Sequence, residues 1–302
     1  MKPSIVDTSD ALYTPAQCVR DIKRIASQYP AFSKAFAFGA SNWGAPLYCL
    51  AVGNFRAAKR VLILGGTHAR EYMTVQLINK IAAEVISDYE KTYEGRRISV
   101  PPQNVCLFFV PMLNPDGIVI SQGGSDAAPD NYKPFLKTVE IIGHDVSQWK
   151  ANGAAVDLNR TFPASWRLAP LASEGYSGRE PLKCAPEARA LMALCKAYHF
   201  DLALSYHAAG EVIYWRQRGF NNAVSFPLAE AIHRLTGYEL EQDDTSYGGF
   251  KGWFVQTFNR PAFTIEIGLG ATPLPISQFH KIFNQNRAVP PLCELWVQYN
   301  GR

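Results

Sequence analysis

Two side chains of the kind that bind zinc lie three residues apart in the segment His68-Ala-Arg-Glu71. This segment follows an apolar run over residues 61–66, which predicts a buried strand that ends in a glycine turn. Functional groups of α/β folds gather at such strand ends, and an imidazole and a carboxylate placed there can bind one metal ion together. Because a two-residue motif arises by chance in many chains, it predicts a site only if other ligands point to the same place.

A third ligand is offered by His207, which ends another apolar run over residues 201–207. Two imidazoles and one carboxylate leave a fourth position for water, which is the pattern of catalytic rather than structural zinc. We therefore predict one zinc ion bound by His68, Glu71 and His207. The alternative is that His207 only packs at the end of its strand.

A general base is offered by Glu266, which interrupts the apolar run over residues 263–267. An ionised carboxylate is costly in a buried strand unless it is paired or lies near a metal ion. Zinc lowers the pKa of a bound water to about 7, and a carboxylate beside it can take the proton. The alternative is that Glu266 faces solvent from an edge strand.

The elements that would position these residues alternate between strands and helices. This pattern predicts an α/β fold with a mixed, largely parallel central sheet flanked by helices. Residues 122–149 have no clear period and are expected to form a long irregular loop, which in compact domains is usually functional. The predicted strands are 35–41, 47–52, 61–64, 105–113, 201–207 and 263–267, and the predicted helices are 15–29, 74–89, 186–198, 226–235 and 276–299, the last interrupted near Pro290-Pro291.

Composition narrows the class of protein. The chain has 302 residues, of which 47% are hydrophobic, and no linker or repeat divides it, so we expect one domain over residues 1–302 with about ten flexible N-terminal residues. A net charge of +4 without a basic run argues against a nucleic-acid partner, and no apolar stretch is long enough to predict a membrane span. Six scattered cysteines and an N-terminus without an apolar signal core favour the cytoplasm, although a trimmed secreted or periplasmic protein would look the same.

Five motifs, read in order, resemble those of zinc metallocarboxypeptidases of the carboxypeptidase A type. The resemblance covers the chain from about residue 14 to the C-terminus and implies the carboxypeptidase A-like, phosphorylase/hydrolase-like fold. It also implies that a zinc-activated water attacks a peptide bond, and that Glu266 takes its proton and later gives it to the leaving amine. The motifs are His68-Ala-Arg-Glu71, Asn114-Pro-Asp-Gly117, Val156-Asp-Leu-Asn-Arg160, Ser205-Tyr-His207 and Thr264-Ile-Glu266.

The same resemblance implies roles for four polar residues. Asp157 would accept a hydrogen bond from the ring N–H of His68 and fix its tautomer. Asn159 and Arg160 would bind a substrate carboxylate, because a guanidinium makes two parallel bonds to it and an amide adds a third. Arg70 would be an auxiliary substrate contact. Without the resemblance, Asn159 and Arg160 could equally be a solvated pair in a loop.

Two further segments, residues 206–215 and 247–254, resemble bacterial γ-D-glutamyl-L-diamino acid endopeptidases. These enzymes cut the bond between D-glutamate and meso-diaminopimelate or lysine in peptidoglycan stem peptides, so a peptide from peptidoglycan is the implied substrate. Lys251 lies 15 residues before Glu266, where the family has its specificity residue, and would meet the extra carboxylate of diaminopimelate. The alternative is an exposed lysine on a short helix. Tyr247 resembles the family's mobile tyrosine, with Gly248-Gly249 permitting its motion.

The sequence departs from the family pattern at three positions. No arginine occurs between Arg97 and Arg160, where carboxypeptidases place the arginine that stabilises the oxyanion. Lys150 is the nearest basic residue and is our candidate to replace it. Gly252 stands where the endopeptidases have an acidic residue, and Ala208 follows the zinc histidine where the family commonly has serine.

Three other functions fit parts of this pattern. The first is a conventional zinc carboxypeptidase that acts on L-peptides. The second is an aspartoacylase-like zinc deacylase, which shares an Asp-Leu-Asn-Arg element but has a glycine-rich histidine motif unlike His68-Ala-Arg-Glu71. The third is a protein that binds cell-wall peptides without cutting them, an alternative that the missing arginine motivates.

Overall fold

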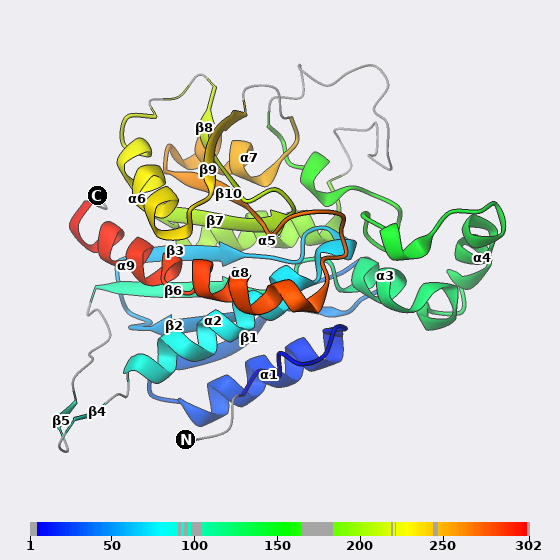
Figure 1. Cartoon of the computed structure of the whole chain (residues 1–302), viewed down its shortest axis with the longest axis horizontal. Helices are drawn as coiled ribbons and strands as arrows, with labels where there is room; N and C mark the ends of the chain where they lie inside the picture. Colours follow the sequence, from blue (N-terminus) through cyan, green and yellow to red (C-terminus); the bar gives the residue numbers. More distant parts are fainter. Residues whose placement is uncertain are drawn as a thin grey trace.

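The centre of the molecule is an eight-stranded sheet in the order β1-β2-β6-β3-β7-β10-β8-β9 (Figure 1). This computed structural model describes residues 5–89, 92–93, 96–97, 104–164, 184–218, 220, 222–243 and 247–300. The strands of the sheet are β1 (Ser33–Ala40), β2 (Pro46–Gly53), β3 (Lys59–Leu64), β6 (Val105–Val110), β7 (Leu202–Ala208), β8 (Val212–Gln217), β9 (Glu239–Asp243) and β10 (Ala262–Ile267); β4 (Thr92–Tyr93) and β5 (Arg96–Arg97) form a separate short pair.

The four middle strands run parallel. β6 pairs with β3, β3 with β7, and β7 with β10 in this orientation, and β8 pairs parallel with β9. β1, β2 and β6 form an antiparallel series at one side, and β10 pairs antiparallel with β8 at the other. Every residue of β6 is buried, as expected for a strand covered on both faces. The predicted mixed, largely parallel sheet is therefore confirmed.

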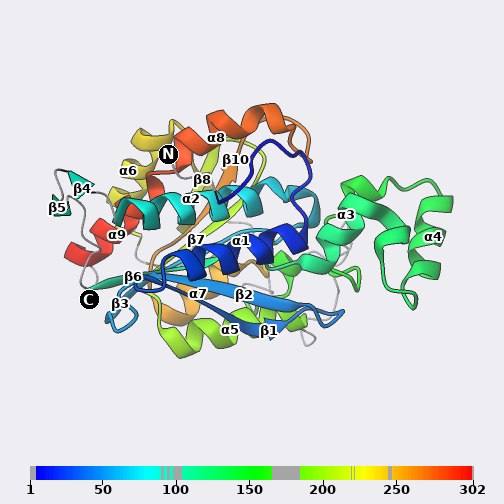
Figure 2. The ribbon, with the colours of Figure 1, turned by 90° about the horizontal axis from the view of Figure 1, so that it is seen from below.

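Helices cover both faces of the sheet (Figures 1 and 2). One core lies between the sheet and α1, α2, α6, α8 and α9, and a second lies between the sheet and α5 and α7. Among the helices that the structure describes, none combines the length and apolar character needed to span a bilayer. Their bounds are α1 (Pro15–Gln28), α2 (Met73–Tyr89), α3 (Pro115–Ala127), α4 (Lys133–Ile141), α5 (Pro186–Tyr198), α6 (Phe226–Thr236), α7 (Phe250–Phe258), α8 (Phe279–Asn286) and α9 (Val289–Asn300).

Local signals account for the first helix. The hydroxyl of Thr14 accepts a hydrogen bond from the backbone N–H of Gln17, and the Gln17 side chain accepts one from the backbone N–H of Thr14. This capping box, with Pro15 in the first turn, begins α1 where the sequence predicts it. Upstream of it, Ile5 and Val6 pack into the first core, and residues 1–4 lie outside the described part of the chain.

The expectation of a long irregular loop over residues 122–149 is wrong. This segment contains the end of α3, all of α4 and a 3-10 turn at Val146–Gln148 (Figure 1). Leu136 and Val139 of α4 pack with Trp149 in a small core of their own. A helix of nine residues buries only these two side chains, so it shows too few turns for its period to stand out in the sequence.

The chain after β7 also differs from the prediction. Strands β8 and β9 were not anticipated, because β8 has only two buried positions and lacks a regular alternation. The C-terminal helical segment is interrupted near Pro290 and Pro291, as predicted. These prolines lie in the first turn of α9, where the missing N–H groups need no intrahelical partner, and the break falls before Val289.

A buried acid in α9 generates a prediction about stability. Glu294 is 4% exposed and accepts a hydrogen bond of 2.7 Å from the Tyr89 hydroxyl. Burial raises the pKa of Glu294 to about 7 from 4.5. The folded protein therefore holds this proton more tightly than the unfolded chain, so the stability that the neutral acid contributes is lost as pH rises from about 4.5 to about 7.

We expect Glu294→Gln to raise the melting temperature at pH 8 and to change it little at pH 5, because the amide keeps the Tyr89 bond and removes the charge. Thermal unfolding followed by circular dichroism at both pH values tests this. Glu230→Gln, at an exposed position of α6, is the control and should show no such pH dependence. A lower melting temperature of Glu294→Gln at pH 8 would contradict the explanation.

Candidate functional site

Three potential metal ligands meet at the carboxyl ends of two neighbouring strands. His68 and Glu71 follow β3, in the turn that leads to α2, and His207 is the sixth residue of β7. Because β3 and β7 are parallel and adjacent, their carboxyl ends lie at the same edge of the sheet. One ligand atom from each residue lies within 4.8 Å of the others, and all three residues are buried.

The donor atoms have a spacing that suits zinc. His68 Nδ1 lies 2.8 Å from Glu71 Oε1, and His207 Nδ1 lies 3.1 Å from Glu71 Oε2 and 3.2 Å from His68 Nδ1. Zinc bonds of about 2.0–2.2 Å in tetrahedral directions set neighbouring ligand atoms roughly 3.3–3.6 Å apart. The three donors need to separate only slightly to surround one ion, so the residues present fit the metal.

Each imidazole is oriented through its other ring nitrogen. His68 Nε2 lies 3.2 Å from Asp157 Oδ1, as the sequence predicts. His207 Nε2 lies 3.1 Å from the Ser205 hydroxyl, a partner that the sequence analysis missed. The available signal was the spacing, because residues two apart on a strand share one face. Partners of this kind hold the ligand rings in place and tune their basicity.

The electrostatics of the cluster favour a cation. Burial disfavours the charged form of His68, Glu71, Asp157 and His207. At the first three of these residues, attraction to oppositely charged neighbours outweighs burial and stabilises the charged form. The charges of Glu71 and Asp157 overcome burial and raise the pKa of His68 to about 9. Conversely, the pKa values of both carboxyls stay well below their usual range despite burial, chiefly because of His68. Burial prevails only at His207, whose pKa is lowered. The ionised carboxylate of Glu71 therefore faces the point where a metal ion would bind, and that of Asp157 lies on the far side of the His68 ring.

The Asn114-Pro-Asp-Gly117 motif holds the metal-binding turn. The Asn114 amide donates to Thr67 O at 3.2 Å and to Ala151 O at 3.0 Å, joining the residue before His68 to the segment after Lys150. A Cβ on Gly117 would lie 2.2 Å from Ala151 O, which explains the glycine at that position. The motif thus positions ligands without contacting the metal site itself.

Glu266 lies beside the ligands rather than at a solvent-facing edge. Its strand, β10, runs between β7 and β8, and Glu266 is paired in register with His207 on one side and Val212 on the other. The alternative of an edge strand is therefore wrong. Burial, with a smaller contribution from the charge of Glu71, raises the pKa of Glu266 to about 8. Such a carboxyl can both accept and return a proton near neutral pH.

A cavity of about 720 Å³ brings the predicted residues together. It is large enough for a short peptide and combines polar groups from segments far apart in the sequence. His68, Glu71 and Glu266 line it, and Asp157 and His207 contact the lining residues His68 and Glu71. The residues predicted to contact substrate also line it: Arg70, Lys150, Asn159, Arg160, Tyr247 and Lys251.

The two residues predicted to bind a carboxylate are held by local contacts. Asn159 Oδ1 accepts from the backbone N–H of Phe250 at 3.0 Å, which ties the loop to the start of α7. The Arg160 guanidinium lies 5.3 Å from the centre of the Tyr247 ring. Both side chains are half-buried and line the cavity.

The two lysines occupy different parts of the cavity. Lys150 Nζ forms an ion pair of 3.0 Å with Asp157 Oδ2, so its charge lies close to the metal ligands. Lys251 is on the short helix α7, but it is only 6% exposed and donates a hydrogen bond of 2.6 Å to Arg216 O. The alternative of an exposed lysine is therefore wrong, and Lys251 contributes a buried polar group to the cavity wall.

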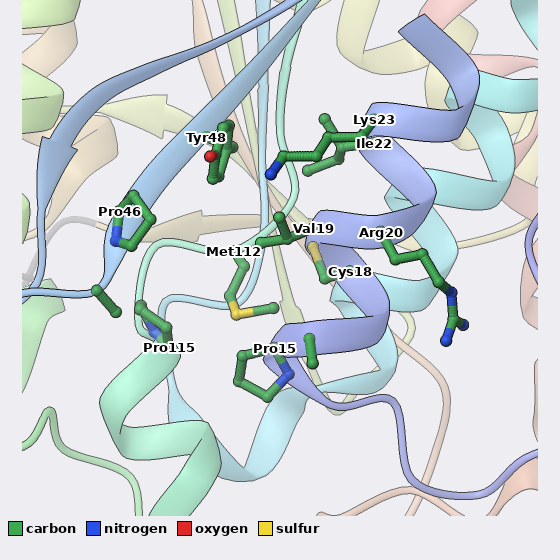
Figure 3. A pocket seen from close by; sticks show the side chains of 12 residues that line it. Pro15, Cys18, Val19, Arg20, Ile22, Lys23, Pro46, Tyr48, Met112 and Pro115 are labelled. Carbon is green, nitrogen blue, oxygen red and sulfur yellow. The ribbon is translucent and has the colours of Figure 1, made fainter. Parts of the chain in front are cut away.

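Another cavity, of about 500 Å³, lies between α1 and β2 (Figure 3). Its lining is mostly apolar, and the Lys23 ammonium lies over the Tyr48 ring, 5.4 Å from its centre. None of the predicted ligands, acids or bases lines it. The chemistry of the chain therefore belongs to the cavity above the His68–Glu71–His207 cluster.

The contact between Ser205 and His207 can be tested by metal binding. We expect Ser205→Ala to weaken zinc affinity by roughly 10–100-fold, because the imidazole loses the partner that orients it. His207→Ala, which removes a ligand, should weaken it further. Competition against a chromogenic chelator measures both. Ser33→Ala, at a buried hydroxyl bonded to Tyr29 O, is the control, and equal affinity in Ser205→Ala and Ser33→Ala would refute the role of Ser205.

Comparison with known proteins agrees with this geometry. Residues 18–289 match the zinc carboxypeptidase family. A relative, gamma-D-glutamyl-L-diamino acid endopeptidase 1 of Lysinibacillus sphaericus, is 33% identical over 281 residues, which are 90% of this chain and 70% of that protein.

Solved structures show the same fold. Thrombin activatable fibrinolysis inhibitor has a TM-score of 0.73 at 19% identity, over 99% of this chain and 78% of that one. The murein-tripeptide amidase MpaA of Escherichia coli O157 has a TM-score of 0.52 at 21% identity, over 87% and 91%. The predicted carboxypeptidase A-like fold is thus confirmed. Since the family match spans most of a chain that also carries a His–Glu–His group able to bind a metal ion, the protein belongs to the zinc carboxypeptidase family of metallopeptidases.

Proposed function

We propose that this metallopeptidase hydrolyses the bond between γ-D-glutamate and a diamino acid in peptidoglycan stem peptides. The observation that carries the proposal is the buried Lys251 in the wall of the catalytic cavity. A pocket for an apolar side chain would gain nothing from a buried lysine, whereas a side chain that ends in a carboxylate can pair with it. The relative from Lysinibacillus sphaericus, whose name states this activity, supports the same assignment.

Substrate would be held at both carboxylates of the diamino acid. Arg160 and Asn159 bind its α-carboxylate, with Arg70 as an additional donor, because all three line the same cavity. Lys251 pairs with the second carboxylate of diaminopimelate. This places the amide bond to D-glutamate next to Glu266 and the His–Glu–His cluster, and Tyr247, stacked on Arg160, lies where it can cover the bound peptide.

The residues of the chain then divide the chemistry. His68, Glu71 and His207 would hold the zinc ion, which would supply a Lewis acid for the scissile carbonyl and for water. Glu266 removes a proton from the attacking water and passes it to the departing amine, a role that its place beside the metal ligands supports. Lys150 contributes positive charge near the carbonyl oxygen, in place of the arginine that the sequence lacks at this point.

The other candidate functions are less well supported. Family membership separates the chain from aspartoacylase-like deacylases, and the complete set of ligands, base and cation gives no reason for a protein that only binds peptides. A conventional carboxypeptidase shares the catalytic residues and is distinguished by substrate.

We also propose a reducing compartment, the cytoplasm, because all six cysteines are free in the structure.

Hydrolysis of defined peptides tests the proposal. We expect the protein with zinc to cleave the tripeptide L-alanyl-γ-D-glutamyl-meso-diaminopimelate in preference to L-peptides of equal length. Glu266→Gln should lower kcat by roughly 10²–10⁴-fold while zinc remains bound, because the proton carrier is lost and the ligands are intact. Chromatography of the products and metal analysis measure the two quantities. Cleavage of L-peptides alone would favour the conventional carboxypeptidase.

The role of Lys150 has a separate test. We expect Lys150→Met to lower kcat by about 10²–10³-fold, the usual cost of losing an oxyanion stabiliser, and Lys150→Arg to retain more activity. Because Lys150 also pairs with Asp157, both variants are assayed at saturating zinc and their zinc contents are compared. An unchanged kcat in Lys150→Met would show that another group stabilises the oxyanion.

A further inference from the structure

The side chain of Gln217 adds an amide group to the lining of the catalytic cavity. Gln217, the last residue of β8, is 6% exposed and lines the cavity. Its backbone is fixed, because Gln217 N donates to Asn222 Oδ1 and the Asn222 amide donates to Gln217 O, each at 3.0 Å. These two bonds hold the backbone at the end of β8, from which the Gln217 side chain reaches the cavity.

The glycine at position 252 makes room for this amide. A Cβ built on Gly252 would lie 3.1 Å from Gln217 Oε1, closer than an ordinary van der Waals contact. The backbone of Gly252 lies in α7 and needs no left-handed conformation, so a helix-favouring residue would be tolerated there on backbone grounds. A side chain at 252 would therefore press on the amide oxygen opposite, which would have to move by a few tenths of an ångström.

Gln217 lies beside the lysine assigned to the substrate's second carboxylate. Lys251 precedes Gly252 in the chain, and its ammonium donates to the backbone carbonyl of Arg216, the residue before Gln217. Positive charge and a neutral hydrogen-bonding amide therefore meet at one end of the cavity. The distal carbon of diaminopimelate carries a carboxylate and an ammonium, and the second of these needs an acceptor.

We propose that Gln217 is a specificity-determining residue whose side-chain oxygen accepts a hydrogen bond from the distal ammonium of the diamino acid. This inference rests on the proposed function and extends it. It assigns a residue that recognises the ammonium in a chain that has Gly252 where the endopeptidases have an acidic residue. Lys251 and Gln217 together match a head group of both charges. A substrate that ends in lysine would bring an ammonium without a carboxylate next to the positive charge of Lys251. The like charges would repel, so the site selects diaminopimelate over lysine.

The test uses a substrate pair that differs only in this ammonium. One tripeptide ends in meso-diaminopimelate and the other in 2-aminopimelate, which keeps the distal carboxylate and lacks the second amine. We expect the parent to prefer the first, and Gln217→Met to lower kcat/KM for it by roughly 10–100-fold, mainly through KM, because an ammonium buried without its acceptor is penalised. Activity on the 2-aminopimelate peptide should change by less than about threefold, so the preference collapses.

Two further variants separate this role from damage to the fold. Gly252→Ala places a methyl group against Gln217 Oε1 and should weaken the preference for the diaminopimelate tripeptide by displacing the amide. This variant keeps the inference testable if Gln217→Met does not fold. Gln242→Met is the matched control, because Gln242 also lines the cavity but is exposed and accepts a hydrogen bond from Arg216. It should leave the preference unchanged.

The outcomes distinguish this inference from the proposed function. A parent that cleaves neither tripeptide overturns the proposed function, and the inference with it. A parent that cleaves both equally well, or a Gln217→Met protein that folds and keeps the preference, overturns the inference alone. Loss of the preference in Gln217→Met and Gly252→Ala, with the preference intact in Gln242→Met, supports it.

Discussion

The approach of three buried donors, His68 Nδ1, His207 Nδ1 and one Glu71 carboxylate, is the interaction on which the rest of the site depends. Burying charged and polar groups at the carboxyl ends of the strands costs free energy unless each group is paired. The chain meets this cost with a second ring of contacts. Asp157 and Ser205 hold the two imidazoles, Lys150 balances Asp157, and the Asn114 amide fixes the turn before His68.

The topology of the sheet explains why these groups meet. β3, β7 and β10 are adjacent and parallel, so the residues at their carboxyl ends share one edge although they are far apart in the chain. The antiparallel pairing of β8 with β10 then adds a wall that continues into Gln217 and, across the cavity, α7. As a result, acidic groups gather at the catalytic end, and Lys251 and Gln217 stand at the end that would recognise a side chain.

Sequence reasoning reached much of this arrangement because its signals are local. A ligand at the end of an apolar run, as at His68 and His207, can be read from a dozen residues, and so can the capping box that starts α1. Reasoning was weaker where elements are short or half-buried. The nine-residue helix α4 and the strand β8 have too few buried positions to show a period.

By itself, the sequence determined the kind of chemistry, because metal ligands and a buried acid next to strand ends are a property of residue type and position along the chain. Only the tertiary structure decided which side chains support them. The ion pair of Lys150 with Asp157 and the approach of Gln217 to Gly252 form only when the folded chain brings these segments together. Such pairings depend on packing distances of a few ångströms, which residue order does not specify.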